Sequence, residues 1–165
     1  MSAADFHLRP FEPEDLPALQ QIRAAAFAPV FRSFRDLVGP DIAGIALAQS
    51  EAEQARLLDE CCAPGSRHLV LVATRGDAVA GFVTFSVDAD GKLGEIGLNA
   101  VHPDHAGRGI GTAMYARALA VMATLGAKAV EVGTGGDPSH APARRAYEKA
   151  GFGPSIPSVT LYRLL

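Results

Sequence analysis

Apolar residues recur along this chain with two different periods, and the period changes several times. From residue 12 to 27 they recur every three or four positions behind an acidic first turn, which is typical of an amphipathic helix. A second helical region is expected approximately from residue 41 to 60. Helical spacing returns over residues 112–126 and 141–151, and each of these runs ends on a glycine that closes the helix.

Between the helices, β-branched and aromatic residues gather in short runs that predict strands. The stretch 68–101 contains three such runs, and the turn pairs Gly76-Asp77 and Asp90-Gly91 separate them. This pattern favours an antiparallel meander. Single strands are expected at residues 6–11, 127–134 and 158–165. The alternation of helices and strands, without a linker or a repeat, predicts one mixed α+β domain.

Composition and charge narrow the classes of partner. The chain of 165 residues is 48% hydrophobic, which suits one substantial core, and its net charge of −3 with a pI near 5.9 disfavours generic nucleic-acid binding. No apolar run approaches the roughly 20 residues that span a bilayer, and residues 1–16 lack the features of a signal peptide. We expect a soluble cytoplasmic protein that binds neither nucleic acid nor membrane, with Cys61 and Cys62 as unpaired thiols.

One loop carries a pattern suited to binding an anion. It has the sequence HPDHAGRGIGTAM, residues 102–114, and joins a predicted strand to a predicted helix whose first N–H groups have no partner. Its alternate glycines let a phosphate approach the main chain, although it matches neither GxGxxG nor a loop ending in GK[ST]. The alternative is a glycine-rich turn without a ligand. His102, Asp104 and His105 look like a metal cluster, but Pro103 and the turn context argue against a metal.

Two segments together resemble a known family. They are EIGLNAVHPDHAGRGIG, residues 95–111, and ARRAYEKAGF, residues 143–152, and they resemble the GNAT superfamily of acyl-CoA-dependent N-acyltransferases. The resemblance covers about residues 68–153. It implies a single GNAT-like domain over residues 1–165, of mixed α/β class, with a mostly antiparallel sheet that is splayed at the acyl-CoA site and flanked by helices. It also implies acetyl-CoA as cosubstrate and no metal.

In that family a glycine loop binds the pyrophosphate of coenzyme A through backbone amides. The resemblance carries this role to six consecutive residues: Gly107, Arg108, Gly109, Ile110, Gly111 and Thr112. The chain departs from the pattern at Ala106, where the family has Gln or Arg, so one side-chain contribution is lost. Arg108 could supply a phosphate contact instead, or it could be a solvated loop charge.

The strand before this loop is where the family holds the pantetheine arm and the thioester. By resemblance, the backbone of Leu98, Asn99, Ala100 and Val101 contacts the cofactor, and an N–H near Leu98 or Asn99 polarises the thioester carbonyl. Glu95 stands where family members often place a general base, which takes a proton from the acceptor ammonium so that the amine can attack. Its alternative role is a structural carboxylate near the rim of the cleft.

The C-terminal motif of the family is matched with one substitution. By resemblance, Tyr147 is the general acid beside the departing sulfur, and Ala143 belongs to the cofactor-binding set. His140 replaces the family's asparagine. It could bond the pantetheine as asparagine does, serve as an alternative base, or be an inert surface residue.

The acceptor site is the part that the sequence specifies least. Phe27, Phe31 and Phe34 form an aromatic stripe at helical spacing, with Arg32 alongside. The stripe predicts either a helix packed on the core or a lid in which Phe27, Phe31 and Arg32 contact the substrate. About 14 residues follow Gly151, which leaves room for one closing strand and for an edge that a second copy could complete in a homodimer.

These expectations combine into one function and two alternatives. The sequence predicts an N-acetyltransferase that moves the acetyl group of acetyl-CoA to a primary amine of a small molecule or protein, by direct attack in a ternary complex. The first alternative is a non-catalytic acyl-CoA-binding module of the same fold, and the second is an interaction domain without a coenzyme. Intact Glu95 and Tyr147 favour catalysis, and the glycine cradle disfavours the last alternative.

Overall fold

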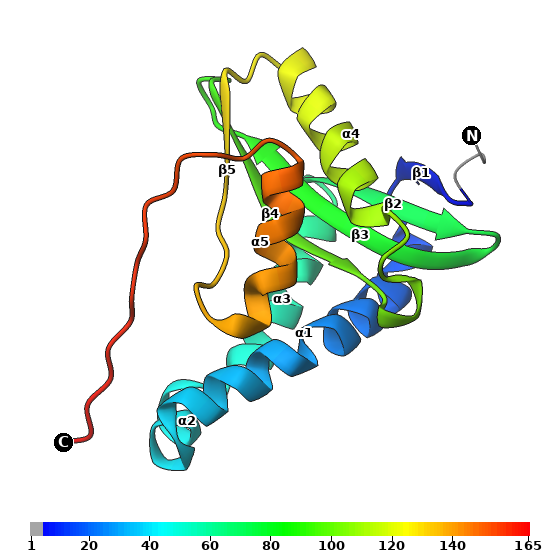
Figure 1. The fold of residues 1–165 in the computed structure, drawn as a ribbon. Coiled ribbons are helices and arrows are strands. Elements are labelled where there is room, and N and C mark those ends of the chain that lie inside the picture. Colours follow the sequence, from blue (N-terminus) through cyan, green and yellow to red (C-terminus); the bar gives the residue numbers. More distant parts are fainter. Residues whose placement is uncertain (1–4) are drawn as a thin grey trace.

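Five strands form one mixed sheet in the structure, a computed structural model that describes residues 5–165 (Figure 1). The strands are β1 (His7–Pro10), β2 (Leu69–Arg75), β3 (Ala78–Val87), β4 (Leu93–Val101) and β5 (Ala129–Val132). They lie in the order β1-β2-β3-β4-β5, with antiparallel neighbours up to β4 and a parallel β4–β5 pair. The expected meander and the mostly antiparallel sheet are therefore confirmed.

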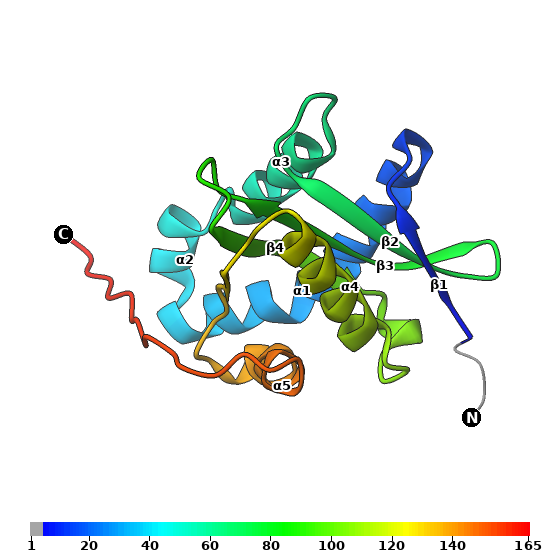
Figure 2. The ribbon, with the colours of Figure 1, turned by 90° about the horizontal axis from the view of Figure 1, so that it is seen from above.

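Helices cover both faces of this sheet (Figures 1 and 2). They are α1 (Leu16–Val38), α2 (Pro40–Ala46), α3 (Ser50–Cys62), α4 (Ile110–Thr124) and α5 (Ala141–Lys149), with short 3-10 turns η1 (Pro13–Asp15), η2 (Pro103–His105) and η3 (Pro138–His140). The side chains of α4 and α5 pack into a core on one face, and those of α1 and α3 pack into a core on the other. No helix in the described part of the chain combines the length and the apolar character needed to cross a bilayer.

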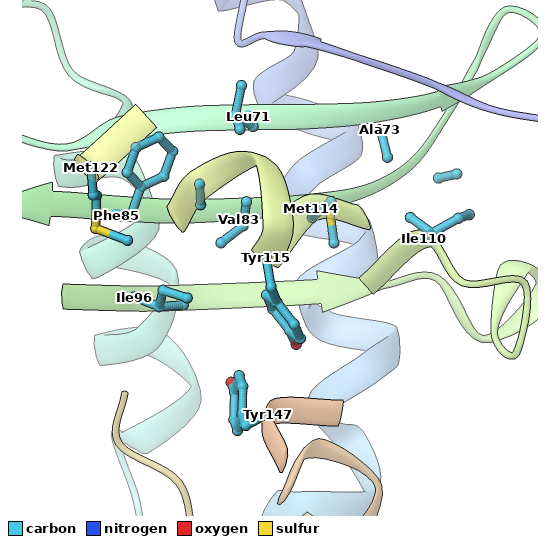
Figure 3. Packing of buried hydrophobic residues seen from close by; sticks show 12 residues of the cluster. Leu71, Ala73, Val83, Phe85, Ile96, Ile110, Met114, Tyr115, Met122 and Tyr147 are labelled. Carbon is cyan, nitrogen blue, oxygen red and sulfur yellow. The ribbon is translucent and has the colours of Figure 1, made fainter. Parts of the chain in front are cut away.

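The two cores follow from the alternation of side chains along each strand. On β3, Val83 and Phe85 join the core under α4, whereas Phe82 joins the core under α1 and α3. Figure 3 shows the first of these cores from close by, with Met122 of α4 beside Phe85. The helix approaches β4 so closely at Gly94 that a Cβ there would lie 2.6 Å from the Met122 sulfur. A larger residue at this position would force the side chains of Met122 and Val130 to move.

The first helix is longer than the sequence pattern predicts. It continues past Phe27 and through Pro29, and it ends before Gly39, whose φ is 79°. Pro29 removes one main-chain N–H from the helix, but Phe31 beyond it is buried and keeps this segment on the protein. The helical region expected at 41–60 is two helices, α2 and α3.

An ion pair fixes the start of α1 to the first strand. The guanidinium of Arg9 donates two hydrogen bonds to the Asp15 carboxylate, at 2.6 and 2.7 Å. Asp15 also accepts a hydrogen bond from the Glu12 N–H at 2.9 Å, so it caps the turn that leads into the helix. These bonds hold the pKa of Asp15 below its usual range despite burial.

The expected last strand at residues 158–165 is wrong. The chain after Gly151 forms neither helix nor strand, and Figures 1 and 2 show it leading away from the body of the protein. A strand needs a neighbouring backbone, and β5 pairs with β4 alone. The segment therefore carries an alternating apolar pattern without a partner, and Leu161 is 89% exposed.

Candidate active site

The sheet opens between its two parallel strands. The pairing of β4 with β5 ends at Ile96 and Val132, whereas β4 continues to Val101. From residue 97 to 101, β4 has a partner strand on its β3 side only. This half of β4 therefore offers a backbone edge with which an extended ligand could pair. The segment expected to contact pantetheine lies on this edge.

A β-bulge interrupts β4 where it begins to part from β5. Asn99 pairs with Val83 and Ile96 pairs with Phe85, so two residues, Gly97 and Leu98, stand opposite a single residue of β3. The bulge reverses the alternation of the strand: Ile96 joins the core under α4, whereas Leu98 packs against the core on the opposite face. A regular ladder would not turn the backbone at this point, and this is where the family resemblance places the donor for the thioester carbonyl.

The glycine loop leads directly into the uncapped start of α4. Gly107 and Gly109 have φ values of 74° and 79°, a region that side chains with a Cβ rarely adopt. Gly109 is the N-cap residue of α4 and no side chain caps this helix, so the first N–H groups lack partners within the helix. Nothing lies within 4 Å of a Cβ built on either glycine. The loop therefore presents main-chain donors to open space, as an anion cradle requires.

The side chains of this loop divide into exposed and buried ones. Arg108 and Thr112 are exposed, and Arg108 forms no ion pair with any residue from 5 to 165. Ile110 is buried in the core under α4, so only its backbone can serve a ligand. Nδ1 of His102 accepts a hydrogen bond from the Asp104 N–H, which stabilises the turn before the loop. In the described residues, no group of three His, Cys, Asp or Glu side chains could hold a metal ion.

Two buried tyrosines and a half-buried asparagine form a hydrogen-bond cluster beside the bulge. Tyr115 of α4 donates to Oδ1 of Asn99 at 2.7 Å, and Nδ2 of Asn99 lies 2.9 Å from the Tyr147 hydroxyl. The same Nδ2 donates to the carbonyl of Gly97 at 2.9 Å. Figure 3 shows Tyr115 and Tyr147 reaching toward one another from α4 and α5. The structure thus places Tyr147 directly against the bulged segment of β4.

Burial sets the protonation state of both phenols. Burial raises the pKa of Tyr147, and its hydrogen bonds with Asn99 and Tyr115 oppose that rise without cancelling it. Burial, together with the neighbouring Tyr147, also raises the pKa of Tyr115. Both side chains are therefore protonated at neutral pH, and Tyr147 has a proton to give.

Glu95 lies on the other face of the sheet. Its neighbours Gly94 and Ile96 face α4, so the Glu95 side chain points toward the α1 and α3 side, where it is exposed. Its register partner on β5 is a second carboxylate, Glu131. The structure does not bring Glu95 into the tyrosine cluster. It places Glu95 and Tyr147 on opposite faces, with the opening between β4 and β5 beside them.

His140 belongs to a separate cluster that joins η3 to α1. Its Nδ1 lies 2.6 Å from Oδ1 of Asp137, and its ring stacks on Phe34 at a centroid distance of 5.6 Å. Asp137 Oδ2 accepts hydrogen bonds from Ser33 Oγ at 3.0 Å and from Ser139. Burial raises the pKa of Asp137, but the bonds from Ser139, His140 and Ser33 outweigh it and hold the pKa well below its usual range. His140 is thus oriented rather than free.

The aromatic stripe of α1 serves packing at two of its three positions. Phe31 is buried, and Phe27 packs against it at a centroid distance of 6.5 Å, whereas Phe34 turns to His140. Arg32 is exposed and lines a shallow hollow of about 350 Å³ between α1 and Pro138. Phe31 is held in the packing of α1, whereas Phe27 is half-buried, and a substrate contact for either ring stays a prediction. Ala143 also packs against the core under α4.

Three contributors to these clusters are not identified by the sequence patterns. In the sequence, Tyr115 occupies an ordinary apolar position of α4, and no motif or spacing connects it with Asn99. Asp137 and Ser33 lie 104 residues apart, so only the fold shows that they bond. Asp137 does precede a proline and a helix start, which is a weak signal of a capping role.

Comparisons with known proteins agree with this geometry. The chain resembles a GNAT-family protein from Desulfovibrio desulfuricans (21% identity, 92% of this chain and 87% of that chain covered, TM-score 0.70). It also resembles the ribosomal-protein-S18-alanine N-acetyltransferase from Escherichia coli (22%, 92% and 79%, TM-score 0.65). A third similar structure is that of AAC(6')-Iy in complex with the bisubstrate analogue CoA-S-monomethyl-acetylneamine (12%, 97% and 99%, TM-score 0.64). These likenesses show the fold.

Sequence comparison decides the family. No curated protein sequence matches the chain. The family model described as the Acetyltransferase (GNAT) family, however, matches residues 31–152. Because this match spans most of the chain, from α1 through the glycine loop to the helix that carries Tyr147, the chain belongs to the GNAT family of acetyltransferases.

Proposed function

We propose that this protein transfers the acetyl group of acetyl-CoA to a primary amine of a small molecule or protein, by direct attack in a ternary complex. The observation that carries the proposal is the opening of the sheet after Ile96 and Val132, with the uncapped start of α4 at one side of it. A pantetheine arm can pair with the free edge of β4 while the glycine loop holds its pyrophosphate.

The proposed chemistry uses the two faces of the sheet. Glu95 takes a proton from the acceptor ammonium on one face, and the neutral amine attacks the thioester carbon. An N–H of the bulged segment at Leu98 or Asn99 stabilises the developing oxyanion. The C–S bond then breaks, and Tyr147 protonates the thiolate on the other face. As the amide forms, the nitrogen loses its second proton, one proton returns to the Tyr147 phenolate, and the proton on Glu95 leaves to solvent. The net result is one amide, one thiol and one released proton.

The acceptor amine could come from either of two classes. Among the similar structures, one protein is named for acetylating an alanine of ribosomal protein S18 and another binds a bisubstrate analogue of an aminoglycoside. Arg32 and Asp36 both line the shallow hollow on α1, so this hollow suits a partner with an anionic group beside a cationic amine.

A ligand-binding experiment tests this function and its non-catalytic alternative together. Acetyl-CoA at a hundred times its Kd should stabilise the protein by about 2.7 kcal/mol in thermal unfolding, and pantetheine lacking the pyrophosphate should do much less. Thiol release is then measured with a panel of amines. Stabilisation without thiol release for any amine would favour the acyl-CoA-binding module, and equal stabilisation by pantetheine would overturn the role of the glycine loop.

We propose further that the protein is a homodimer in which each chain lends its C-terminal segment to the other. Polar and apolar residues alternate over residues 158–161 of the C-terminal segment, and Val159 and Leu161 are 85% and 89% exposed. Within residues 5–165, the outer edge of β5 has no partner strand. When two copies exchange these segments, the C-terminal segment of each chain can pair with the free edge of β5 in the other.

A further inference from the structure

The amide orientation of Asn99 is fixed by the groups around it. One terminal atom of this amide lies 2.9 Å from the Gly97 carbonyl, which can only accept, so that atom is Nδ2. The other atom, Oδ1, therefore receives the Tyr115 proton at 2.7 Å. Tyr115 and Gly97 together prevent the amide from turning over.

This orientation determines how Asn99 meets Tyr147. Nδ2 lies 2.9 Å from the Tyr147 oxygen, whereas Oδ1 lies farther from it, at 3.3 Å, and already accepts from Tyr115. The shorter contact is thus a donation from the amide to the phenol oxygen. Tyr147 accepts this bond, and its own proton makes only the longer contact to Oδ1, at 3.3 Å, which a stronger acceptor can replace.

We propose that Asn99 is a positioning residue for Tyr147, and that Tyr115 holds Asn99 in the orientation that this role needs. The amide donates to the phenol oxygen at 2.9 Å, and the phenol proton, held only by the longer contact to Oδ1, can turn to the sulfur of the leaving group. After the proton has been given, the same bond stabilises the phenolate. This inference rests on the proposed function, because it assigns a proton donor to the acetyl transfer.

Among the described residues, Asn99 is the side chain whose hydrogen bond to the Tyr147 oxygen the geometry supports. Tyr115 is the titratable group packed against Tyr147, at a ring-centroid distance of 5.0 Å. The remaining aromatic neighbour, Phe152, has no polar atom. No charged side chain of residues 5–165 hydrogen-bonds to the Tyr147 hydroxyl. A carboxylate in place of the amide would accept the phenol proton and withhold it from the substrate.

The test compares three variants with a matched control. Asn99→Leu removes the donor without adding charge, Asn99→Asp replaces it with an acceptor, and Tyr115→Phe releases the amide. Gln21→Glu, at an exposed position of α1, makes the same change of amide to carboxylate away from the cluster. Steady-state kinetics gives kcat and the KM for acetyl-CoA. The ionisation of Tyr147 is followed by NMR with tyrosine labelled at Cζ, which is practical because the chain has three tyrosines.

We expect kcat to fall about 10-fold to 10²-fold in Asn99→Leu and Asn99→Asp, less in Tyr115→Phe and not in Gln21→Glu, with KM nearly unchanged. The ionisation of Tyr147 should move up by about one pH unit or more in both Asn99 variants, because the phenolate loses its donor. An unmoved ionisation in Asn99→Leu would overturn the proposal whatever the activity. A moved ionisation with unchanged kcat would overturn the positioning role but leave the acetyltransferase function standing, whereas an inactive wild-type protein would remove that function itself.

Discussion

The Asp137 carboxylate lies 2.6 Å from Nδ1 of His140 and is bonded at its other oxygen to Ser33 of α1. Through these bonds, Asp137 and His140 fix the loop before α5 to α1. No described residue hydrogen-bonds to Nε2 of His140. A histidine held in this way can offer Nε2 to a ligand, so the choice between Glu95 and His140 as base becomes a question that variants can answer.

The first prediction separates the two candidate bases. Glu95→Gln should depress kcat/KM and weaken the limb of the pH–rate profile that reports deprotonation of the acceptor, because the amide cannot take a proton. His140→Asn should be tolerated, since it restores the residue that the family has at this position. Both profiles are measured with one amine of known pKa. An unchanged profile in Glu95→Gln together with a collapsed profile in His140→Asn would assign the base to His140.

The second prediction concerns the proton donor. Tyr147→Phe keeps the ring that packs against Tyr115 and Phe152 and removes only the hydroxyl. We expect kcat to fall about 10²-fold or more when the chemical step is limiting, which lies within the usual range for a general acid. Calorimetry should show almost the same affinity for coenzyme A. Undiminished turnover would mean that the thiolate leaves without a proton from this residue.

The third prediction uses two glycines with the same backbone conformation. Gly109 and Gly65 have φ values of 79° and 80°, and a Cβ on either would meet nothing within 4 Å. Alanine at each should therefore cost a similar free energy of unfolding, about 1 kcal/mol, through backbone strain alone. Only Gly109→Ala should weaken acetyl-CoA binding, because it alone disturbs the start of α4. Equal binding losses in the two variants would contradict the cradle.

The fourth prediction follows from the depressed pKa of Asp137. Its hydrogen bonds favour the carboxylate in the folded state, so Asp137→Asn should lower the free energy of unfolding at neutral pH by about 1–3 kcal/mol. A lowered folded-state pKa contributes stability above the unfolded value of about 3.9, and this contribution is lost as the pH falls through the folded value. The difference between wild type and variant should therefore shrink below about pH 4.

The control for this experiment is Asp77→Asn, in the exposed turn after β2. Denaturant unfolding of the three proteins from pH 7 to pH 3 supplies the comparison. Asp77→Asn should show no loss of stability at neutral pH. A constant difference between wild type and Asp137→Asn over the whole range would show that the charge of Asp137 does not contribute.

The fifth prediction tests the exchange of C-terminal segments. Leu161→Asp should convert a dimer into a monomer, because a charge cannot be buried in the exchanged strand. Ile45→Asp is the matched control, since Ile45 is 77% exposed on α2 and lies outside the exchange. Sedimentation or light scattering reports the mass. A monomeric wild type, or a dimer that persists in Leu161→Asp, would contradict the exchange.

The sequence predicts local features of the fold well because local features depend on local patterns. The turns at Gly76 and Gly91, the glycine-started α4 and the meander all follow from spacing and turn chemistry. The length of α1 does not, because burial of Phe31 holds the helix together beyond Pro29. The strand expected at 158–165 fails for a similar reason: alternation shows that a segment suits a sheet, not that an edge lies within its reach.

The candidate site, too, could be predicted from the sequence only in part. The family resemblance assigns catalytic roles to Tyr147 and to the strand that contains Asn99. The fold brings Nδ2 of Asn99 within 2.9 Å of the Tyr147 hydroxyl. The resemblance assigned Asn99 a main-chain role, however, and its side chain turns out to join two helices. The hydrogen bonds of Asn99 join it to Tyr115 and Tyr147, which lie 16 and 48 positions further along the chain. No spacing rule identifies such contacts.

The separation of Glu95 and Tyr147 by the sheet has a consequence for how such a protein changes over time. Under the proposed chemistry, the amine is recognised on the face of α1 and the thiol departs on the face of α4 and α5. Substitutions that remodel the first face then alter the choice of acceptor without touching the groups that hold the donor. The chain can therefore acquire a new substrate through changes confined to the layer around Glu95, while the half that holds the acetyl donor is inherited intact.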